Sequence, residues 1–244
     1  EVYNNIGTIL SEKGLSIEAI EHFSKSIELN ENYYEAFNNR GLEFFKLKKI
    51  ENAIDDFQRS ININPNYESP YINIANIFQF EKKEYKKAIQ NYLKGLHINS
   101  TQYVSYNNLG VCFTNLKKFD ESINYFDKAI NFKLDYAAAY NNKGYALFCL
   151  NSFEEALKCF EIALSLDPKN PEIPLNIGNL MSVVSRYAEA VKYFEKAISL
   201  KPDYADAYFN LSLIKLQFCD FKNGLRLYEY RLSQNKKEKM FTSE

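Results

Sequence analysis

Residues 137–170 read AAAYNNKGYALFCLNSFEEALKCFEIALSLDPKN, and this stretch decides the fold class. Gly144 is followed by Ala156 twelve residues on, by Phe160 four residues further and by Ala163 three residues further. These spacings place the last three residues on one face of a helix. Small residues let a second helix approach closely, and the aromatic ring fills the space beside them. The stretch therefore predicts a pair of packed α-helices.

The same pattern recurs along the chain about every 34 residues. The third copy has one extra residue, because thirteen positions rather than twelve separate Ala75 from Ala88. Such a period predicts a solenoid of repeated helix pairs. We expect an array over residues 1–232 and a polar tail or linker over 233–244. The predicted repeats span residues 1–33, 34–67, 68–102, 103–136, 137–170, 171–204 and 205–232.

The repeat unit resembles the tetratricopeptide repeat, a 34-residue helix–turn–helix unit with an aromatic residue, then Gly, Ala, Phe, Ala and Pro in order. The family often carries Trp at the fourth position of the repeat. Here other aromatic residues stand at that position: Tyr3, Phe37, Tyr71, Tyr106, Tyr140 and Tyr208. The resemblance implies an all-α, right-handed superhelical solenoid of about seven units. It also implies that the first helix of each repeat lines a concave groove.

Composition excludes several other classes of protein. Only 8 Gly and 6 Pro argue against a loop-rich β sandwich or a collagen-like chain, and 25% charged residues are ordinary for a globular protein. A net charge of −1 lacks the basic excess of a general nucleic-acid binder. No apolar run approaches the roughly 20 residues needed to cross a bilayer. The four cysteines form no Cys-x-x-Cys pair, which favours reduced thiols and a cytoplasmic location.

Asparagine occupies one repeat position in all seven copies. When the repeats are numbered so that Gly144 and its equivalents stand at position 8, this is position 6. Further asparagines stand at positions 5 and 9, and Tyr145 projects toward the same side. The position-6 residues are Asn5, Asn39, Asn73, Asn108, Asn142, Asn176 and Asn210. The neighbouring residues are Asn4, Asn38, Asn107 and Asn141 at position 5, and Asn76 and Asn179 at position 9.

Two interpretations of this asparagine ladder are open. A carboxamide offers one acceptor and two donors, which match the N–H and C=O of an extended peptide. The row resembles the peptide-holding ladder in the tetratricopeptide domain of O-linked N-acetylglucosamine transferases. Alternatively, Asn at position 6 is a family feature that forms hydrogen bonds between neighbouring repeats.

We therefore predict a protein-interaction scaffold that binds an extended peptide in its groove through the ladder. The alternative is an assembly scaffold that binds a helix or a folded partner without the ladder. The seventh repeat, with Tyr228-Glu229-x-Arg231, resembles closing repeats that precede glycosyltransferase-type domains, so the scaffold could recruit substrates for such a domain or partner. A capping repeat is the other interpretation of that segment.

No sequence pattern predicts catalysis in this chain. His22 and His97 are the two histidines, and both stand in predicted second helices without metal-ligand spacing. We expect no cofactor, no metal, no nucleic-acid partner and no membrane insertion. The expected partner is a protein or peptide, and the expected state is a monomer or a weak dimer through the terminal repeats.

Overall fold

The computed structural model describes residues 1–230, which are α-helical apart from one π-helical turn and the connecting turns, and which contain no strand. The predicted tail 233–244 and the last two residues of the predicted seventh repeat lie outside the described residues. The all-α fold class is confirmed. The chain divides into two compact units, Glu1–Lys118 and a second that begins at Phe119. Each unit is described separately below.

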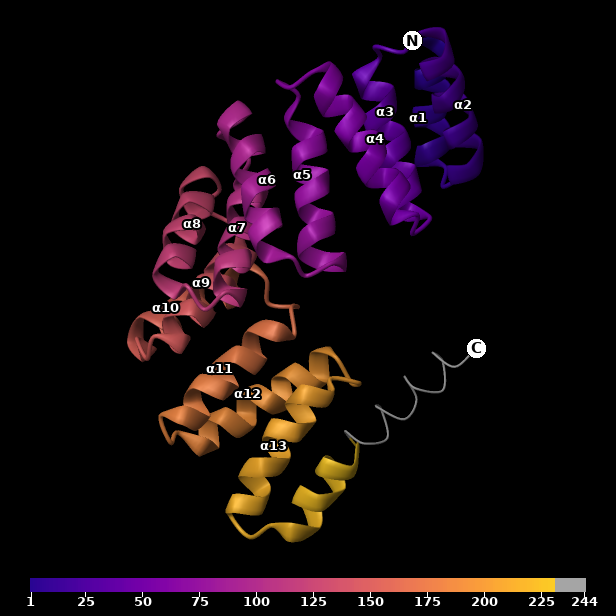
Figure 1. Cartoon of the computed structure of the whole chain (residues 1–244). Coiled ribbons are helices and arrows are strands. Elements are labelled where there is room, and N and C mark those ends of the chain that lie inside the picture. The colour runs from indigo at the N-terminus through magenta and orange to yellow at the C-terminus, as the bar shows by residue number, and fades with distance from the viewer. Residues whose placement is uncertain (231–244) are drawn as a thin grey trace. The chain divides into compact units, whose positions relative to one another are not determined.

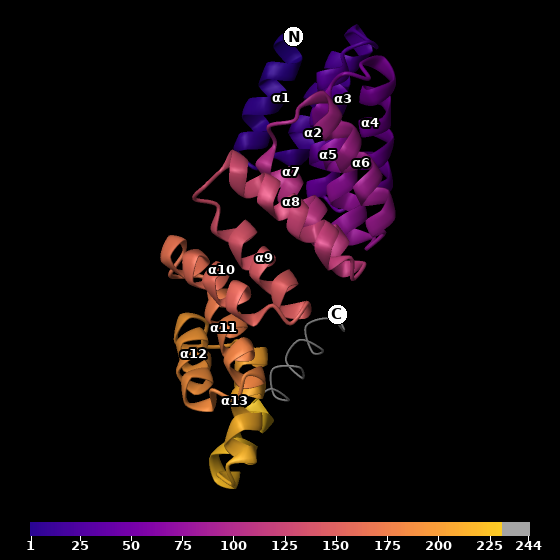
Figure 2. The same cartoon turned by 90° about the vertical axis from the view of Figure 1, so that its left-hand side faces the viewer.

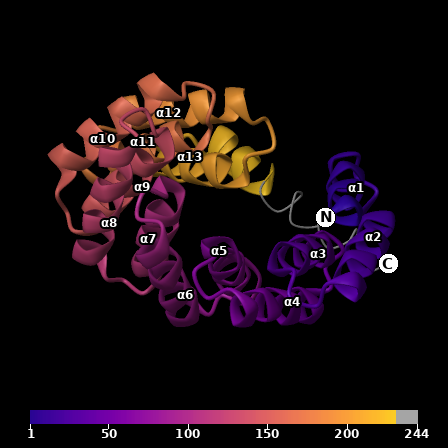
Figure 3. The same cartoon turned by 90° about the horizontal axis from the view of Figure 1, so that it is seen from above.

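The first unit consists of consecutive helix pairs that lie side by side (Figures 1 and 2). Seen from above, α3 and α5 lie on the inner side of this unit, and α4 and α6 lie on its outer side (Figure 3). Along the first helices, α1 contacts α3, and α3 contacts α5. The elements are α1 (Val2–Glu12), α2 (Ser16–Leu29), α3 (Tyr34–Lys46), α4 (Ile50–Ile63), α5 (Glu68–Asn76), η1 (Ile77–Glu81), α6 (Tyr85–Ile98) and α7 (Tyr103–Asn115).

The second unit repeats the same arrangement, with α9 packed on α10 and α11 packed on α12. Residues 221–230 form a further helix after α13. This last helix contacts α13 through aromatic rings, since the centroids of Tyr208 and Tyr230 lie 4.1 Å apart. The elements are α8 (Phe119–Phe132), α9 (Ala137–Cys149), α10 (Phe153–Leu166), α11 (Glu172–Val183), α12 (Tyr187–Leu200) and α13 (Ala205–Gln217).

The glycine of the first helix faces the aromatic ring of the second helix, as the sequence pattern predicts. A Cβ atom added at Gly144 would lie 2.7 Å from Cε1 of Phe160, and the added Cβ at Gly178 would lie 2.5 Å from Cε1 of Phe194. No side chain larger than hydrogen fits at that separation. The ring that fills this place is almost completely buried in six repeats, and these rings form the centre of the core: Phe23, Phe57, Tyr92, Phe126, Phe160 and Phe194.

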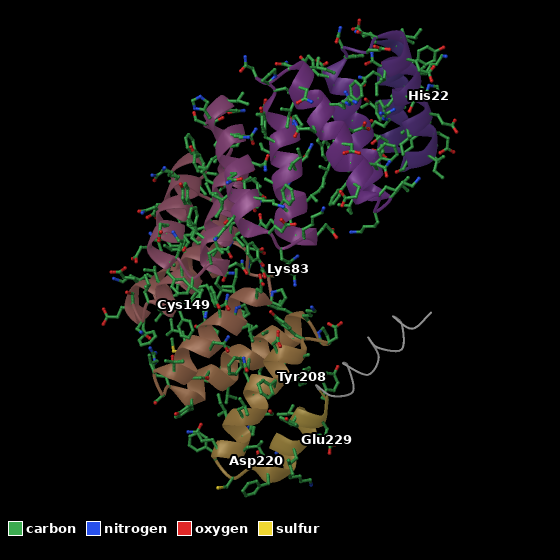
Figure 4. The ribbon with its side chains drawn as sticks, in the orientation of Figure 1. His22, Lys83, Cys149, Tyr208, Asp220 and Glu229 are labelled. Carbon is green, nitrogen blue, oxygen red and sulfur yellow. The ribbon has the colours of Figure 1, made fainter. Side chains whose placement is uncertain are left out.

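The turn between the two helices of a repeat passes through the left-handed region of the backbone. Gly14 takes this conformation in the first repeat, with φ of +76°. In the later repeats non-glycine residues take it, with φ between 53° and 61°, and among them is Lys83 (Figure 4). A side chain at such a φ is strained by crowding between Cβ and the backbone. These residues are Lys48, Lys83, Lys117, Asn151, Ser185 and Cys219.

The extra residue of the third repeat is absorbed in the π-helical turn η1. The backbone N–H of Lys82 donates to the carbonyl of Ile77, five residues back, at 3.1 Å. One inserted residue in a helix commonly produces such a turn. Tyr92 stands where the other repeats have Phe, and its hydroxyl lies 2.6 Å from Oδ1 of Asn76 and 2.6 Å from Oε1 of Gln79. Among the described residues, no helix is long and apolar enough to cross a membrane.

Candidate functional site: the first-helix faces

The position-6 asparagines lie on the first helices of their repeats, as predicted. Asn5, in the first repeat, is exposed. The other six are half-buried: Asn39, Asn73, Asn108, Asn142, Asn176 and Asn210. A half-buried carboxamide keeps part of its surface accessible while one side packs against the protein. These side chains can therefore serve a structural contact and a ligand at once.

In the first unit, the position-6 amides of the second, third and fourth repeats each donate to an asparagine of the preceding repeat. Nδ2 of Asn39 donates to Oδ1 of Asn4 at 3.2 Å, and Nδ2 of Asn73 donates to Oδ1 of Asn38 at 3.0 Å. A longer contact of the same kind, at 3.5 Å, joins Nδ2 of Asn108 to the position-9 residue of the third repeat. The ladder thus links adjacent repeats by side-chain hydrogen bonds.

The second unit repeats this arrangement in its last two repeats. Nδ2 of Asn176 donates to Oδ1 of Asn141 at 3.0 Å, and Nδ2 of Asn210 donates to Oδ1 of Asn179 at 2.7 Å. Each such bond uses one of the two N–H groups of the donor. Among the described residues, no group donates to Oδ1 of Asn176 or of Asn210. These two amides therefore keep one N–H and the oxygen for another partner.

The position-5 asparagines are more buried than the position-6 residues. Asn4, Asn38, Asn107 and Asn141 are all buried. Three of them, Asn4, Asn38 and Asn141, accept the hydrogen bonds from the following repeat described above. Nδ2 of Asn107 lies 3.5 Å from Oδ1 of Asn108 on the same helix. The position-9 residues Asn76 and Asn179 are half-buried and accept from the following repeat. Direct contact of the position-5 residues with a peptide stays a prediction.

A hollow of about 610 Å³ lies on the first-helix face of the second unit. The predicted site residue Tyr145 lines it and is 45% exposed. Val183 and Leu213, from α11 and α13, line it too and are 56% and 47% exposed. The full lining is Tyr145, Phe148, Asn179, Ser182, Val183, Tyr187, Phe194, Asn210, Leu213, Ile214 and Gln217. The hollow thus brings together three predicted residues, Tyr145, Asn179 and Asn210.

The side chains that line this hollow are uncharged. Among the described residues, no Asp, Glu, Lys, Arg or His side chain lines it. Burial and the neighbouring Cys149 raise the pKa of Tyr145, and burial raises the pKa of the Cys149 thiol. Cys149 is the last residue of α9 (Figure 4). The hollow is therefore an uncharged surface of apolar groups and amides.

The corresponding face of the first unit contains a buried carboxylate that the sequence reasoning missed. Glu43 of α3 is 1% exposed, and its Oε1 accepts from Oγ of Ser11 at 2.5 Å and from Nζ of Lys46 at 2.6 Å. Together with Thr8 and Leu42 these residues line a smaller hollow of about 220 Å³. The sequence did contain a signal for this buried carboxylate, because the repeat position of Glu43 is apolar in the other repeats, as at Leu180. The hollow of the first unit is therefore lined by a carboxylate and an ammonium group, whereas no charged side chain among the described residues lines the hollow of the second unit.

The histidines and acidic residues do not gather into a metal site. Among the described residues, no three His, Cys, Asp or Glu side chains lie close enough to hold a metal ion. His22 lies on α2 (Figure 4) and His97 lies on α6, so the two histidines belong to different repeats.

Family models match most of the chain. Models described as "Tetratricopeptide repeat" match residues 1–33, 34–67, 103–133 and 137–170, and one described as "TPR repeat" matches residues 185–217. No curated protein matches the chain significantly. Solved structures with the same fold are similar at low sequence identity.

One similar structure is YrrB, described as a TPR protein with an unusual peptide-binding site, at 21% identity and a TM-score of 0.64 over 76% of this chain and 95% of that chain. A tetratricopeptide repeat protein from Parabacteroides merdae is 16% identical, with a TM-score of 0.77 over 95% of this chain and 91% of that chain. A chain of the APC/C hetero-tetramer Cut9-Hcn1 is 17% identical, with a TM-score of 0.76 over 96% of this chain and 46% of that chain. The matched repeats cover more than half of the sequence. The chain therefore belongs to the tetratricopeptide repeat family and is a protein-interaction scaffold.

Proposed function

We propose that this scaffold binds an extended peptide segment along its first helices, and that the position-6 carboxamides hold the peptide backbone. The supporting observation is that two of these amides, Asn176 and Asn210, use only part of their hydrogen-bonding capacity within the protein. One N–H of Asn176 or Asn210 bonds to the preceding repeat, and the second N–H and the oxygen have no partner among the described residues. A donor and an acceptor side by side match the C=O and N–H of an extended chain.

The bonds between repeats also make the row suitable for binding. A bond of 2.7–3.0 Å fixes the rotamer of the position-6 side chain before a ligand arrives. A pre-organised side chain loses less conformational entropy on binding, which raises affinity. In this proposal the buried Asn38 and Asn141 are positioning residues, since each accepts the bond that orients a ladder amide.

An extended partner fits these groups better than a helical one. Within a helix, the backbone N–H and C=O groups are already paired with each other. A row of neutral amides therefore gains little from a helical ligand, whereas each residue of an extended ligand presents unpaired groups. The alternative, a scaffold that binds a helix or folded partner without the ladder, predicts that the ladder amides are dispensable for binding.

The test compares two alanine variants that break the same hydrogen bond from opposite sides. Asn176→Ala and Asn141→Ala both remove the 3.0 Å bond, so both should lose about 0.5–1.5 kcal/mol of stability. Only Asn176→Ala removes a groove amide. The probe is a fluorescein-labelled 12-residue peptide selected on the wild-type protein from a random phage-displayed library, with affinity measured by fluorescence polarisation.

We expect Asn176→Ala to weaken peptide binding by about five- to a hundredfold, because two hydrogen bonds to the ligand are lost. Asn141→Ala should weaken binding by only about two- to threefold, because the Asn176 amide remains but is no longer pre-organised. The pair Asn73→Ala and Asn38→Ala repeats the comparison in the first unit, where the shared bond is also 3.0 Å. Equal losses of affinity within both pairs, or no loss in either, would overturn the proposal.

Three finer predictions from the sequence stay predictions. They are recruitment of substrates for a glycosyltransferase-like domain or partner, a cytoplasmic location, and a monomer or weak dimer. Arg231, which completes the seventh-repeat pattern, lies outside the described residues.

A further inference from the structure

The hollow in the second unit exposes large apolar side chains from three successive first helices. Tyr145, Val183 and Leu213 are each about half exposed although they lie next to a packed core. Apolar side chains clustered in a concave place, rather than scattered, commonly mark an interaction site. Phe148 is a further apolar side chain in the lining of the hollow.

The polar groups of the hollow are amides rather than charges. Asn179 and Asn210 lie in its wall, joined by the 2.7 Å bond, and the oxygen of Asn210 has no donor among the described residues. Ser182 is already occupied, because its hydroxyl donates to the carbonyl of Gly178 at 2.9 Å. A charged ligand group would lose water here without gaining an ion pair, which is unfavourable. The hollow therefore selects against charge.

The size of the hollow fits a side chain together with its backbone. Its volume of about 610 Å³ lies within the range of sites that hold small ligands, which are mostly apolar with a few placed polar groups. The corresponding hollow of the first unit holds about 220 Å³ and is lined by Glu43 and Lys46. A hollow that is both large and uncharged therefore belongs to the second unit.

We propose that this hollow takes one large uncharged apolar side chain of the bound segment, such as Phe, Tyr, Leu or Met. Asn179 and Asn210 bind the segment's backbone beside that side chain. This inference rests on the proposed function, in which the segment is extended along the first helices. It adds a requirement that the partner's sequence contain such an apolar residue. The asparagine ladder alone does not impose this requirement, because it binds only backbone groups.

The test uses random 12-residue peptides displayed on phage and selected separately on the wild-type protein, Leu213→Asp and Ile162→Asp. Leu213 lines the hollow, whereas Ile162 is a similarly exposed apolar residue of α10 that does not. We expect peptides selected on the wild-type protein and on Ile162→Asp to share one large apolar residue. Leu213→Asp should bind these peptides at least tenfold more weakly.

Exchange of the shared apolar residue for Ala should weaken wild-type binding by about ten- to a hundredfold, as expected for an apolar side chain removed from water. The same exchange should have little further effect on Leu213→Asp, because the side chain then has no pocket to fill. Leu213→Ala should give a smaller loss, and it serves as the second variant if Leu213→Asp alters the thermal unfolding midpoint.

The possible failures are distinguishable. If the wild-type protein selects no peptide, the proposed function itself fails. If selected peptides depend on Asn176 but share no apolar residue, or ignore Leu213→Asp, this inference fails and the proposed function stands. Selected peptides that become helical on binding, with apolar residues at helical spacing, would overturn the inference in favour of a helix seated in the hollow.

Discussion

The ion pair between buried Glu43 and half-exposed Lys46 predicts opposite effects for substitutions of its two members. Glu43 is almost completely buried, whereas the Lys46 side chain is 50% exposed. The second carboxylate oxygen of Glu43 is buried and has no hydrogen-bond partner among the described residues. In five of the other repeats the equivalent position is a buried apolar residue, as at Ile77 and Leu180. The carboxylate is therefore costly to bury and needs its cation.

Lys46→Met leaves that carboxylate buried without its counter-ion. Loss of one partner of a buried pair costs about 3–5 kcal/mol, and partial solvent exposure of Lys46 reduces the expected cost to about 1–3 kcal/mol. Glu43→Ile removes the buried charge and leaves a half-exposed lysine that water can solvate. Replacement of a buried charge by an apolar side chain is often neutral or stabilising, so we expect a change between zero and a gain of about 2 kcal/mol.

Urea unfolding, combined with hydrogen exchange of the α1 and α3 amides, measures these changes, because a repeat array can open locally before it unfolds globally. Lys25→Met is the matched control, since Lys25 and Glu28 form an ion pair whose side chains are both more than half exposed. It should leave the unfolding midpoint unchanged. A Glu43→Ile protein that is less stable than Lys46→Met would refute the reasoning.

The dependence of stability on pH provides a second readout of the same pair. Burial raises the pKa of Glu43, but the polar groups of Lys46, Ser11 and Ser16 and the charge of Lys46 outweigh it, so the pKa lies below its ordinary value of 4.5. A lowered pKa contributes stability that is present above the unfolded-state value and is lost as pH falls through the folded-state value. The wild-type protein should therefore lose more stability than Glu43→Ile when the pH falls below about 4.5.

Three further predictions concern single positions. Gly178→Ala should cost about 1–3 kcal/mol in urea unfolding, because the added Cβ would lie 2.5 Å from Cε1 of Phe194; an unchanged midpoint would contradict this. Tyr92→Phe restores the aromatic residue of the other repeats but should still cost about 1–3 kcal/mol, because its buried hydroxyl lies 2.6 Å from two amide oxygens. Iodoacetamide at pH 8 should alkylate exposed Cys219 before Cys112, since burial raises the pKa of the Cys112 thiol to about 12. Mass spectrometry of the modified peptides gives the order of alkylation, and faster modification of Cys112 would contradict the prediction.

The helix pairs were predictable because the spacing of small and aromatic residues fixes which helix faces meet. The contact between Gly144 and Phe160, for example, follows from the pattern alone. The sequence also showed that the third repeat has one extra residue between Ala75 and Ala88, but it did not predict that this residue would produce a π turn. An extra residue can be placed in either helix or in the turn, and the packing around Tyr92 and Gln79 decides between them.

The candidate site was predictable only in part. Sequence placed Asn176 and Tyr145 on the groove side, yet it left open whether the amides bond to a ligand or to other repeats. That question depends on side-chain rotamers and on distances such as the 3.0 Å from Asn176 to Asn141. The burial of Glu43 was missed because a charged residue on a helix is usually solvated, and only comparison with the same position in other repeats indicates otherwise.

The π turn has a consequence for which length changes this chain tolerates. One residue inserted in an α-helix rotates everything beyond it by about 100°. Here the π turn begins at Ile77, so Asn73 and Asn76 precede it and keep their positions on the first helix. The change in helix phase is confined to the residues between Ile77 and the start of α6. The same insertion four residues before Asn73 would swing that amide out of line with Asn38. Natural variants with an added residue should therefore carry it in the last turn of a first helix, because the ladder asparagines precede that turn and keep their orientation.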